Sequence, residues 1–130
     1  MRLLLDTHIW VWSQLEPERL SGKVASALGS AENELWLSPI SVWELVLLVE
    51  KERLAVDHSL DAWIEKAMEA MPTREAPLTH QIVQASRTVD LPHRDPADRF
   101  LAATAKVMDL TLVTADAQLA GASDVSVLRN

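Results

Sequence analysis

The sequence predicts an α/β fold with three layers, α/β/α, in which helices flank a central, mainly parallel sheet of four to five strands. Short apolar runs alternate with segments of helical periodicity along the 130 residues. This alternation favours parallel strands, because each helix carries the chain back across the sheet. A hydrophobic content of 48% is enough for a buried core at this length. No linker or repeat interrupts the pattern, and we therefore expect one domain spanning residues 1–130.

The predicted elements follow from apolar spacing and from the residues that begin or end each segment. Predicted strands are short apolar runs, and predicted helices repeat apolar residues every three or four positions. We expect strands at residues 2–6, 34–37, near 76, 110–114 and 125–127, and helices from residue 7 onwards and at residues 21–31, 39–54, 61–71, 79–89, 97–108 and 115–119.

The helix predicted at residues 39–54 begins with a strong local signal. Ser38 can accept a hydrogen bond from the first helical turn, and Pro39 fits the first helical position because no backbone donor is needed there. The segment is apolar on nearly every side, so we expect it to be buried or pressed against a partner. Its β-branched residues leave a strand as the competing prediction.

Prolines and capping residues divide the second half of the chain. Residues 61–71 have the apolar spacing of an amphipathic helix, which Pro72 ends. Thr79 can cap a helix that stops before Pro92, because the residue preceding a proline disfavours helical geometry. Asp95, followed by a proline, begins the best-defined helix of the sequence.

Four carboxylates, on Asp6, Glu44, Asp98 and Asp116, are predicted to meet at one edge of the sheet. Asp6 closes the first strand and Asp116 follows the strand that ends near Val113. Ligands of open parallel sheets gather at the carboxyl ends of the strands. Glu44 and Asp98 fall in the first or second turns of helices, whose starts also line that edge. We expect raised carboxyl pKa values in such a cluster and a preference for a hard divalent cation.

Helix and turn chemistry offers a simpler account of several of these acids. Glu44 could close a capping box with Ser41, and Asp98 could be present because negative charge suits a helix start. Thr114 and Asp116 could stabilise a turn. Asp6 is the hardest to explain in this way, because it follows three leucines into a sheet interior where an uncompensated charge costs several kcal/mol.

Composition limits the function classes. A net charge of -7 argues against broad phosphate neutralisation by clustered basic residues. A cation bound in an acidic cleft reverses the local field, so a nucleic-acid substrate stays possible. The chain has no cysteine, so a metal must be held by oxygen or by histidine nitrogen, which favours Mg²⁺, with Mn²⁺ possible. No apolar run is long enough for a membrane span, and we expect a soluble, cytoplasmic protein.

Four short motifs, in this order and spacing, resemble the PIN-domain ribonuclease family, in particular the VapC-type toxins of bacterial toxin–antitoxin pairs. They are LLLDTH at residues 3–8, SPISVWE at residues 38–44, LPHRDPADR at residues 91–99 and LVTAD at residues 112–116. The resemblance covers nearly the whole chain. It implies a PIN-like fold and a metal-dependent endoribonuclease.

The resemblance also assigns roles to residues. It places the catalytic acids at Asp6, Glu44, Asp98 and Asp116, with Asp6, Asp98 and Asp116 as metal ligands. Supporting roles fall on Thr7 and Thr114, which border the site, on Asp95 as a helix cap, and on Arg99. We expect Arg99 to approach substrate phosphate or to offset the acids, and His93 and Arg94 to contact substrate.

The implied chemistry is attack of a metal-activated water on an RNA phosphodiester, which leaves a 5'-phosphate and a 3'-hydroxyl. The implied partners are RNA, a cognate VapB-like antitoxin in a groove between the apolar helices, and a second copy of the chain in a homodimer, with no membrane. The remaining histidines are predicted to be surface or structural residues. Trp43 and Trp63 are predicted to serve packing.

Two other function classes stay open at this point. A phosphoacceptor receiver domain has a similar length and alternation, but it requires paired acids after the first strand and a lysine after the last. Here Thr7 follows Asp6, and residues 127–129 contain no lysine. A catalytically silent PIN-like binding module would keep the apolar surface and lose the acids, whereas this chain has all four.

Overall fold

The computed structural model describes residues 1–57, 59–92 and 94–130. Its centre is a five-stranded sheet in the order β3-β2-β1-β4-β5, in which every pair of neighbours is parallel. The strands are β1 (Arg2–Leu5), β2 (Glu34–Leu37), β3 (Arg74–Glu75), β4 (Thr111–Thr114) and β5 (Val127–Arg129). The predicted parallel sheet is confirmed.

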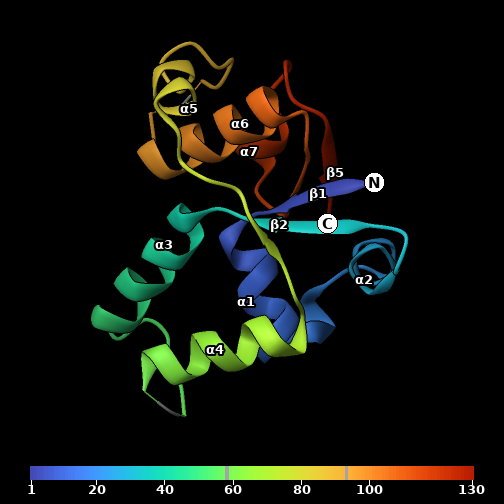
Figure 1. Cartoon of the computed structure of the whole chain (residues 1–130), viewed down its shortest axis with the longest axis vertical. Helices are drawn as coiled ribbons and strands as arrows, with labels where there is room; N and C mark the ends of the chain where they lie inside the picture. Colours follow the sequence, from blue (N-terminus) through green and yellow to red (C-terminus); the bar gives the residue numbers. More distant parts are fainter. Residues whose placement is uncertain (58, 93) are drawn as a thin grey trace.

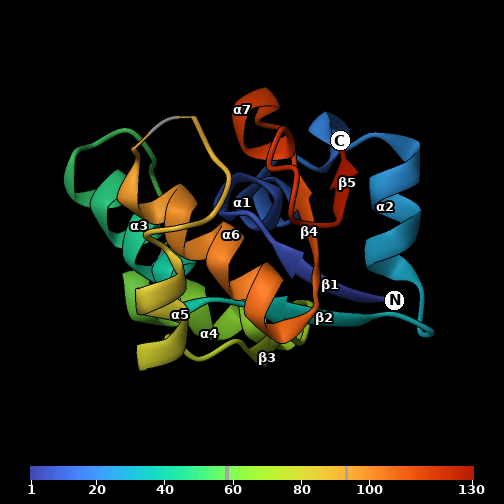
Figure 2. The ribbon, with the colours of Figure 1, turned by 90° about the horizontal axis from the view of Figure 1, so that it is seen from above.

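Helices cover both faces of this sheet (Figures 1 and 2). Figure 1 shows α1 to α4 on one side and α5, α6 and α7 on the other. The helices are α1 (Thr7–Leu15), α2 (Gly22–Gly29), α3 (Pro39–Glu50), α4 (Leu60–Ala70), α5 (His80–Ala85), α6 (Pro96–Met108) and α7 (Ala117–Ala120), with a 3-10 turn η1 (Pro17–Arg19) after α1. The three predicted layers are therefore present.

The buried leucines of β1 divide between two cores. Successive strand residues point to opposite faces. Leu3 and Leu5 pack with the α1 to α4 side, whereas Leu4 packs with Leu101 of α6 and the helices opposite. All three leucines are fully buried. A central strand covered on both faces explains why the sequence shows an unbroken apolar run here rather than an alternating one.

The structure corrects four predicted boundaries. The first strand ends at Leu5 rather than at residue 6, because Asp6 caps α1. Helix α3 ends at Glu50 rather than near residue 54, and Glu52 then takes a positive φ of 57° that ends helical geometry. Helix α5 ends at Ala85 rather than at residue 89. The last strand is Val127–Arg129 rather than residues 125–127, in the register that pairs it with β4.

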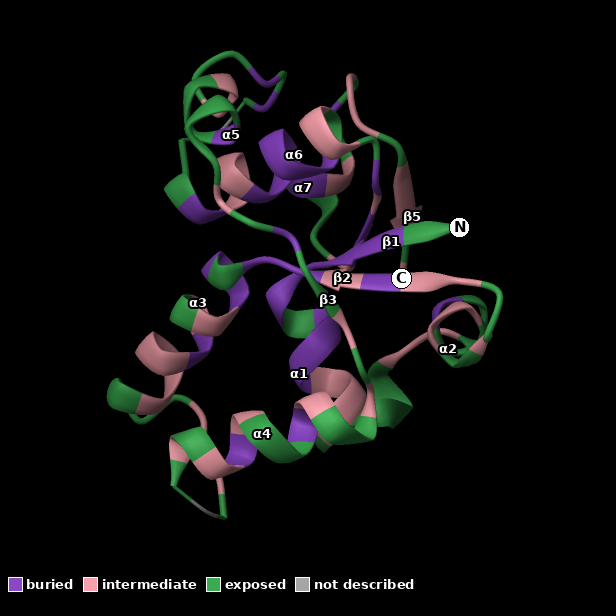
Figure 3. Cartoon of the chain, viewed as in Figure 1, coloured by how far each residue is buried: buried purple, intermediate pink, exposed green. Residues whose placement is uncertain are grey.

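Two predictions about α3 have different outcomes. The segment is helical, as favoured over a strand, but it is buried on one side only, at Ile40, Ser41 and Leu45. Trp43 is 51% exposed, so the prediction that it serves packing is wrong. Trp63 is buried as predicted and meets Trp10 edge-on at 5.6 Å. Figure 3 shows the mixed burial along α3.

Across the described residues, the helices are too short or too polar to cross a membrane.

Candidate active site

Asp6 is held at the carboxyl end of the central strand by two hydrogen bonds to its carboxylate. The backbone N–H of Thr7 donates to Oδ1 at 2.8 Å, and the hydroxyl of Thr114 donates to Oδ2 at 2.7 Å. The side chain is 7% exposed. Burial raises the pKa of Asp6, and the two hydrogen bonds oppose that rise because they stabilise the ionised form.

Thr114 connects two of the predicted site acids. Its hydroxyl oxygen accepts a hydrogen bond from the backbone N–H of Asp116 at 3.0 Å while it donates to Asp6. Asp116 in turn caps α7 by accepting from the N–H groups of Gln118 and Leu119. Thr114 and Asp116 therefore do stabilise a turn, as the simpler account supposed. The same bonds hold Asp116 next to Asp6, so the turn role and a site role are compatible.

Glu44 is fixed from α1 and not by its own helix. The hydroxyl of Thr7 lies 2.5 Å from Glu44 Oε1 and 3.0 Å from the hydroxyl of Ser41. The cap of α3 is Ser38, which accepts from Ile40 N–H, and the N–H of Ser41 donates to the carbonyl of Ser38 at 2.9 Å. The alternative reading of Glu44 as the partner of Ser41 in a capping box is therefore wrong. Burial, followed by the charge of Asp6, raises the pKa of Glu44 despite the Thr7 hydrogen bond.

Asp95 and Asp98 divide two tasks at the start of α6. Asp95 caps the helix, as predicted, by accepting from the N–H groups of Ala97 and Asp98 at 3.0 and 3.4 Å. Asp98 is in the first helical turn, and its pKa is raised to about 7, first by burial and then by the charge of Asp95 and the three other acids. A helix start normally favours an ionised carboxylate. Helix-start chemistry therefore does not account for Asp98.

All of these acids line one pocket of about 320 Å³, whose walls are Asp6, His8, Trp12, Glu44, Asp95, Asp98, Ala115 and Asp116. The described residues that line it include no lysine or arginine. The raised pKa values of Asp6, Glu44 and Asp98 match the expectation for clustered acids without a counterion. We call this cavity the acid pocket.

The donor set of the acid pocket fits a hard divalent cation. It offers carboxylate oxygens from four separate elements, the ligand type that Mg²⁺ and Mn²⁺ prefer. Within residues 1–57, 59–92 and 94–130, no three acidic or histidine side chains are close enough to form a closed metal cage as they stand. Mg²⁺ usually keeps several waters and needs only one or two protein carboxylates, so an open pocket of this kind suits it better than a cage.

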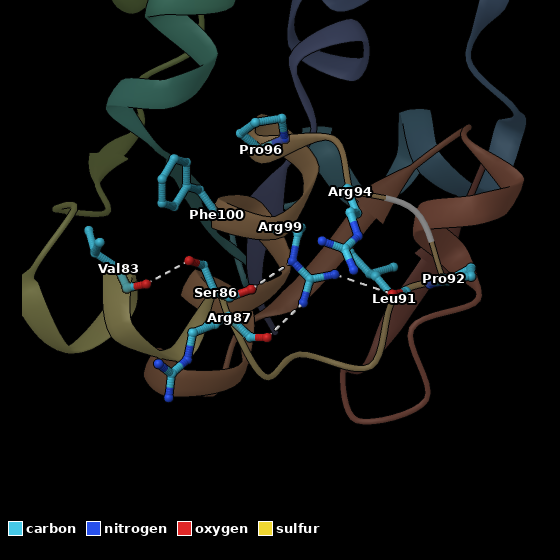
Figure 4. A pocket seen from close by; sticks show the side chains of 9 residues that line it. All are labelled: Val83, Ser86, Arg87, Leu91, Pro92, Arg94, Pro96, Arg99 and Phe100. Atoms are coloured by element: carbon cyan, nitrogen blue, oxygen red, sulfur yellow. Dashed lines mark hydrogen bonds between the residues drawn. The ribbon is translucent and has the colours of Figure 1, made fainter.

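Arg99 has a different environment from the one predicted. Its guanidinium group donates hydrogen bonds to the carbonyls of Ser86, Leu91, Arg87 and Val89, at 2.8 to 3.2 Å. Arg99 therefore holds the segment after α5 and lines a cavity other than the acid pocket (Figure 4). Beyond α5 the N–H groups of Arg87 and Thr88 donate to the carbonyls of Gln84 and Ala85, three residues back, so the α-helical bonding pattern is not continued.

Arg94, which was predicted to contact substrate, is not among the residues that line the acid pocket. Arg94 is exposed and lines a second cavity with Arg99. His93 is outside the described residues. Sequence reasoning missed His8, which lines the acid pocket and whose charge favours ionisation of Asp6 and Glu44. Its position two residues after Asp6, on the first turn of the helix that Asp6 caps, was the available signal.

A half-apolar groove of about 340 Å³ lies beside the acids along α3. Its walls combine Trp43, Leu47 and Leu48 with Glu44 and Asp95 at one end, and Lys51 and Arg53 border the other part. The exposed Trp43 is thus part of a depression next to the acid pocket. We call this depression the α3 groove.

Comparison with known proteins places the chain in a family. The model of the PIN domain matches residues 3–124. The chain belongs to the PIN domain family. It is 36% identical over 120 residues to ribonuclease VapC22 of Mycobacterium tuberculosis. The alignment covers 90% of this chain and 88% of the relative. Family membership removes the receiver-domain alternative.

Solved structures share the fold along almost the full length. The crystal structure of VapBC2 from Rickettsia felis bound to a promoter DNA fragment matches with a TM-score of 0.71 and 15% identity, over 99% of this chain and 98% of that chain. The structure of VapBC-5 from Mycobacterium tuberculosis, a member of the VapBC family of toxin–antitoxin systems, matches with a TM-score of 0.61 and 17% identity, over 99% and 98% of the two chains.

Proposed function

We propose that this protein is a metal-dependent endoribonuclease and the toxin of a toxin–antitoxin pair. The observation that carries the proposal is the convergence of Asp6, Glu44, Asp98 and Asp116 on one pocket of a PIN domain. The relative named ribonuclease VapC22 supports RNA as the substrate. Mg²⁺ is the proposed cofactor, with Mn²⁺ as a substitute.

The proposed metal ligands are Asp6, Asp98 and Asp116. When bound, a divalent cation supplies charge to stabilise the phosphoryl oxygens and lowers the pKa of coordinated water. Thr7 and Thr114 orient the carboxylates of Glu44 and Asp6 through the hydrogen bonds described above. The raised pKa of Glu44 makes its carboxylate a stronger proton acceptor. The products are a 5'-phosphate and a 3'-hydroxyl, and no covalent protein intermediate is needed.

The proposed antitoxin site is the α3 groove. Its apolar wall, exposed at Trp43 and half-buried at Leu47 and Leu48, suits the apolar side of a partner segment, and the adjacent acids suit a basic residue of that segment. The solved toxin–antitoxin structures with this fold support a cognate antitoxin as the occupant. A homodimer through another helical face is part of the same proposal.

The deciding experiment is cleavage of total cellular RNA by the wild type and by Asp98→Asn, each with and without Mg²⁺, with sequencing of the fragment ends. We expect fragments with 5'-phosphates from the wild type in Mg²⁺ only. Asp61→Asn, on the exposed face of α4, is the matched control and should cleave like the wild type. Equal fragmentation by the wild type and by Asp98→Asn would reject the proposal and favour a silent binding module.

A further inference from the structure

A larger cavity, of about 820 Å³, borders the first turn of α6 at Pro96, Arg99 and Phe100 (Figure 4). Three arginines, Arg87, Arg94 and Arg99, line it together with apolar side chains that include Leu91 and Phe100. No acidic residue is among its described walls. In a chain with a net charge of -7, this is a local concentration of positive charge. We call it the arginine pocket.

Arg99 fixes the backbone that forms one wall of the arginine pocket. Its four hydrogen bonds fix the backbone from Ser86 to Leu91, including the carbonyl of Arg87 itself. Those carbonyl oxygens carry partial negative charge that would repel an anion, and the guanidinium group offsets it. The segment that bears Arg87 is thereby held in place without using the side chain of Arg87.

Arg87 and Arg94 differ from the arginines that form ion pairs. Arg2 and Arg74 pair with Glu34, and Arg19 pairs with Glu16. Among the described residues, no carboxylate forms such a pair with Arg87 or Arg94, and both are exposed. Both line a cavity that has no acid among its described walls, and a phosphate matches the donor geometry of a guanidinium group.

The arginine pocket and the acid pocket are connected through neighbouring residues. Arg94 precedes Asp95, and Arg99 follows Asp98; in each pair the acid lines the acid pocket and the arginine lines the arginine pocket. Consecutive Cα atoms are only about 3.8 Å apart. A polyanion with one phosphate at the acids therefore has further phosphates within reach of the arginines.

We propose that the arginine pocket binds a backbone phosphate of the RNA strand next to the phosphodiester that is cleaved. This inference rests on the proposed function, since it assigns the strand's path from the acid pocket. Arg87 and Arg94 make the phosphate contacts, and Arg99 is a positioning residue that holds their wall. The contact is to the backbone, so it adds affinity for a strand without selecting its sequence.

The first test is equilibrium binding of a fluorescent single-stranded RNA in EDTA, where no metal-dependent cleavage occurs, at several salt concentrations. Each phosphate neutralised on a single strand contributes about 0.7 to the slope of log affinity against log salt. We expect the double variant Arg87→Ala/Arg94→Ala to lose about 0.7 from that slope, the contribution of one phosphate, and to bind at least about tenfold more weakly at low salt. The variant Arg87→Lys/Arg94→Lys should keep most of the slope because it keeps the charge.

Arg74→Ala is the matched control. It removes an exposed arginine at β3, outside both pockets, and should leave the slope unchanged. Addition of inorganic phosphate distinguishes a site for the RNA backbone from a site for free phosphate. Weak competition is expected for a site that holds a polymer, whereas full displacement of RNA at equal phosphate concentration would show a site for free phosphate and overturn the inference. An unchanged slope in the double variant would also overturn it.

The second test is the split between kcat and KM in Mg²⁺. With long RNA, the double variant should show a KM raised about tenfold and an unchanged kcat, and with a dinucleotide, which is too short to reach the arginines, neither should change. Equal losses on both substrates would place the arginines at the acids and overturn the inference. Absence of cleavage by the wild type would reject the proposed function, and the binding slope would then decide the arginine pocket alone.

Light scattering of the double variant tests whether a second copy of the chain, instead of RNA, occupies the arginine pocket. An unchanged mass is expected. Conversion of a dimer to a monomer would show that a second copy of the chain fills this face, and it would overturn the inference.

Discussion

The acid pocket and the arginine pocket both border the start of α6, and they differ in how their charges are compensated. In the acid pocket the fold gathers like charges under partial burial, and two threonine hydroxyls compensate them only in part. In the arginine pocket one charged residue, Arg99, is fully used for structure, and two others are left exposed. The comparison teaches that the charged groups available to a ligand are those that the protein's own hydrogen bonds and ion pairs leave uncompensated.

The largest effect should come from the acid that the fold satisfies least. We expect Asp98→Asn to lower kcat for RNA cleavage by at least about a hundredfold, since even residues that only support metal ligands cost about 10 to 100-fold. The measurement is the initial rate in saturating Mg²⁺, with Asp61→Asn as the control. A loss of less than about threefold would remove Asp98 from the proposed ligands.

The next effect separates the structural arginine from the exposed ones. Arg99→Ala removes a charged donor from four carbonyls. Hydrogen bonds to charged groups contribute about 1.5–3 kcal/mol each at most. We therefore expect a loss of about 2 to 4 kcal/mol in the free energy of unfolding. Arg94→Ala, on an exposed side chain, should stay within about 0.5 kcal/mol.

Urea unfolding measures both arginine variants. Arg99→Lys should recover part of the loss only, because an ammonium group does not reproduce the planar fork of donors. Equal stability of the Arg99 and Arg94 variants would contradict the distinction between them.

A smaller effect tests how the fold orients Glu44. Thr7→Val removes the hydroxyl that lies 2.5 Å from Glu44 and keeps the side-chain shape, and we expect kcat to fall by about tenfold. Thr7→Ser, which restores a hydroxyl, should recover most of the rate. Thr104→Val is the matched control, because Thr104 is buried and bonds only to the carbonyl of Phe100 in the described structure. Equal losses at the two threonines would indicate general destabilisation.

The smallest expected effect concerns stability against pH without metal. The pKa of Asp98 is raised from 3.8 to about 7 in the folded chain, so the folded state binds more protons than the unfolded state between these values. The stabilisation is therefore present below the lower value and is lost as pH rises through about 7. Because Asp98 is only half-buried, solvent screening limits the change to about 1 kcal/mol.

Thermal unfolding in EDTA from acid to neutral pH measures this effect. The melting temperature should fall with rising pH in the wild type and fall less in Asp98→Asn. Mg²⁺ should raise it more at the high end of the range than at the low end, because a cation binds the ionised acids. Stabilisation by Mg²⁺ that is equal in Asp98→Asn would contradict the proposed site.

Local signals were sufficient for the fold and for the acids of the acid pocket. The apolar run before Asp6 and the pair Asp95-Pro96 each report on the nearest turn of the chain, and both predicted the correct element. In a parallel sheet the carboxyl ends of the strands share an edge, so the positions of Asp6 and Asp116 followed from local structure alone. The ends of α3 and α5 did not follow, since both helices stop earlier than apolar spacing predicts.

The environments of single side chains required the folded structure. Trp43 has the local sequence of a core residue, but its side chain is exposed and lines the α3 groove. Glu44 satisfied the spacing of a capping box, but its partner is a threonine of α1. Arg99 follows an acid in sequence, yet its side chain donates to the carbonyls of the segment after α5. In each case the deciding neighbour is distant along the chain.

The order of strands and helices, and the identity of the acids at the sheet edge, were determined by the sequence itself, because periodicity, caps and prolines act over a few residues. Tertiary structure alone decided which charges are compensated. Hydrogen bonds and burial depend on residues that approach from separate elements, as with Thr114 and Asp6 or Arg99 and the segment after α5. That is why the acids were predictable and the arginine pocket was not.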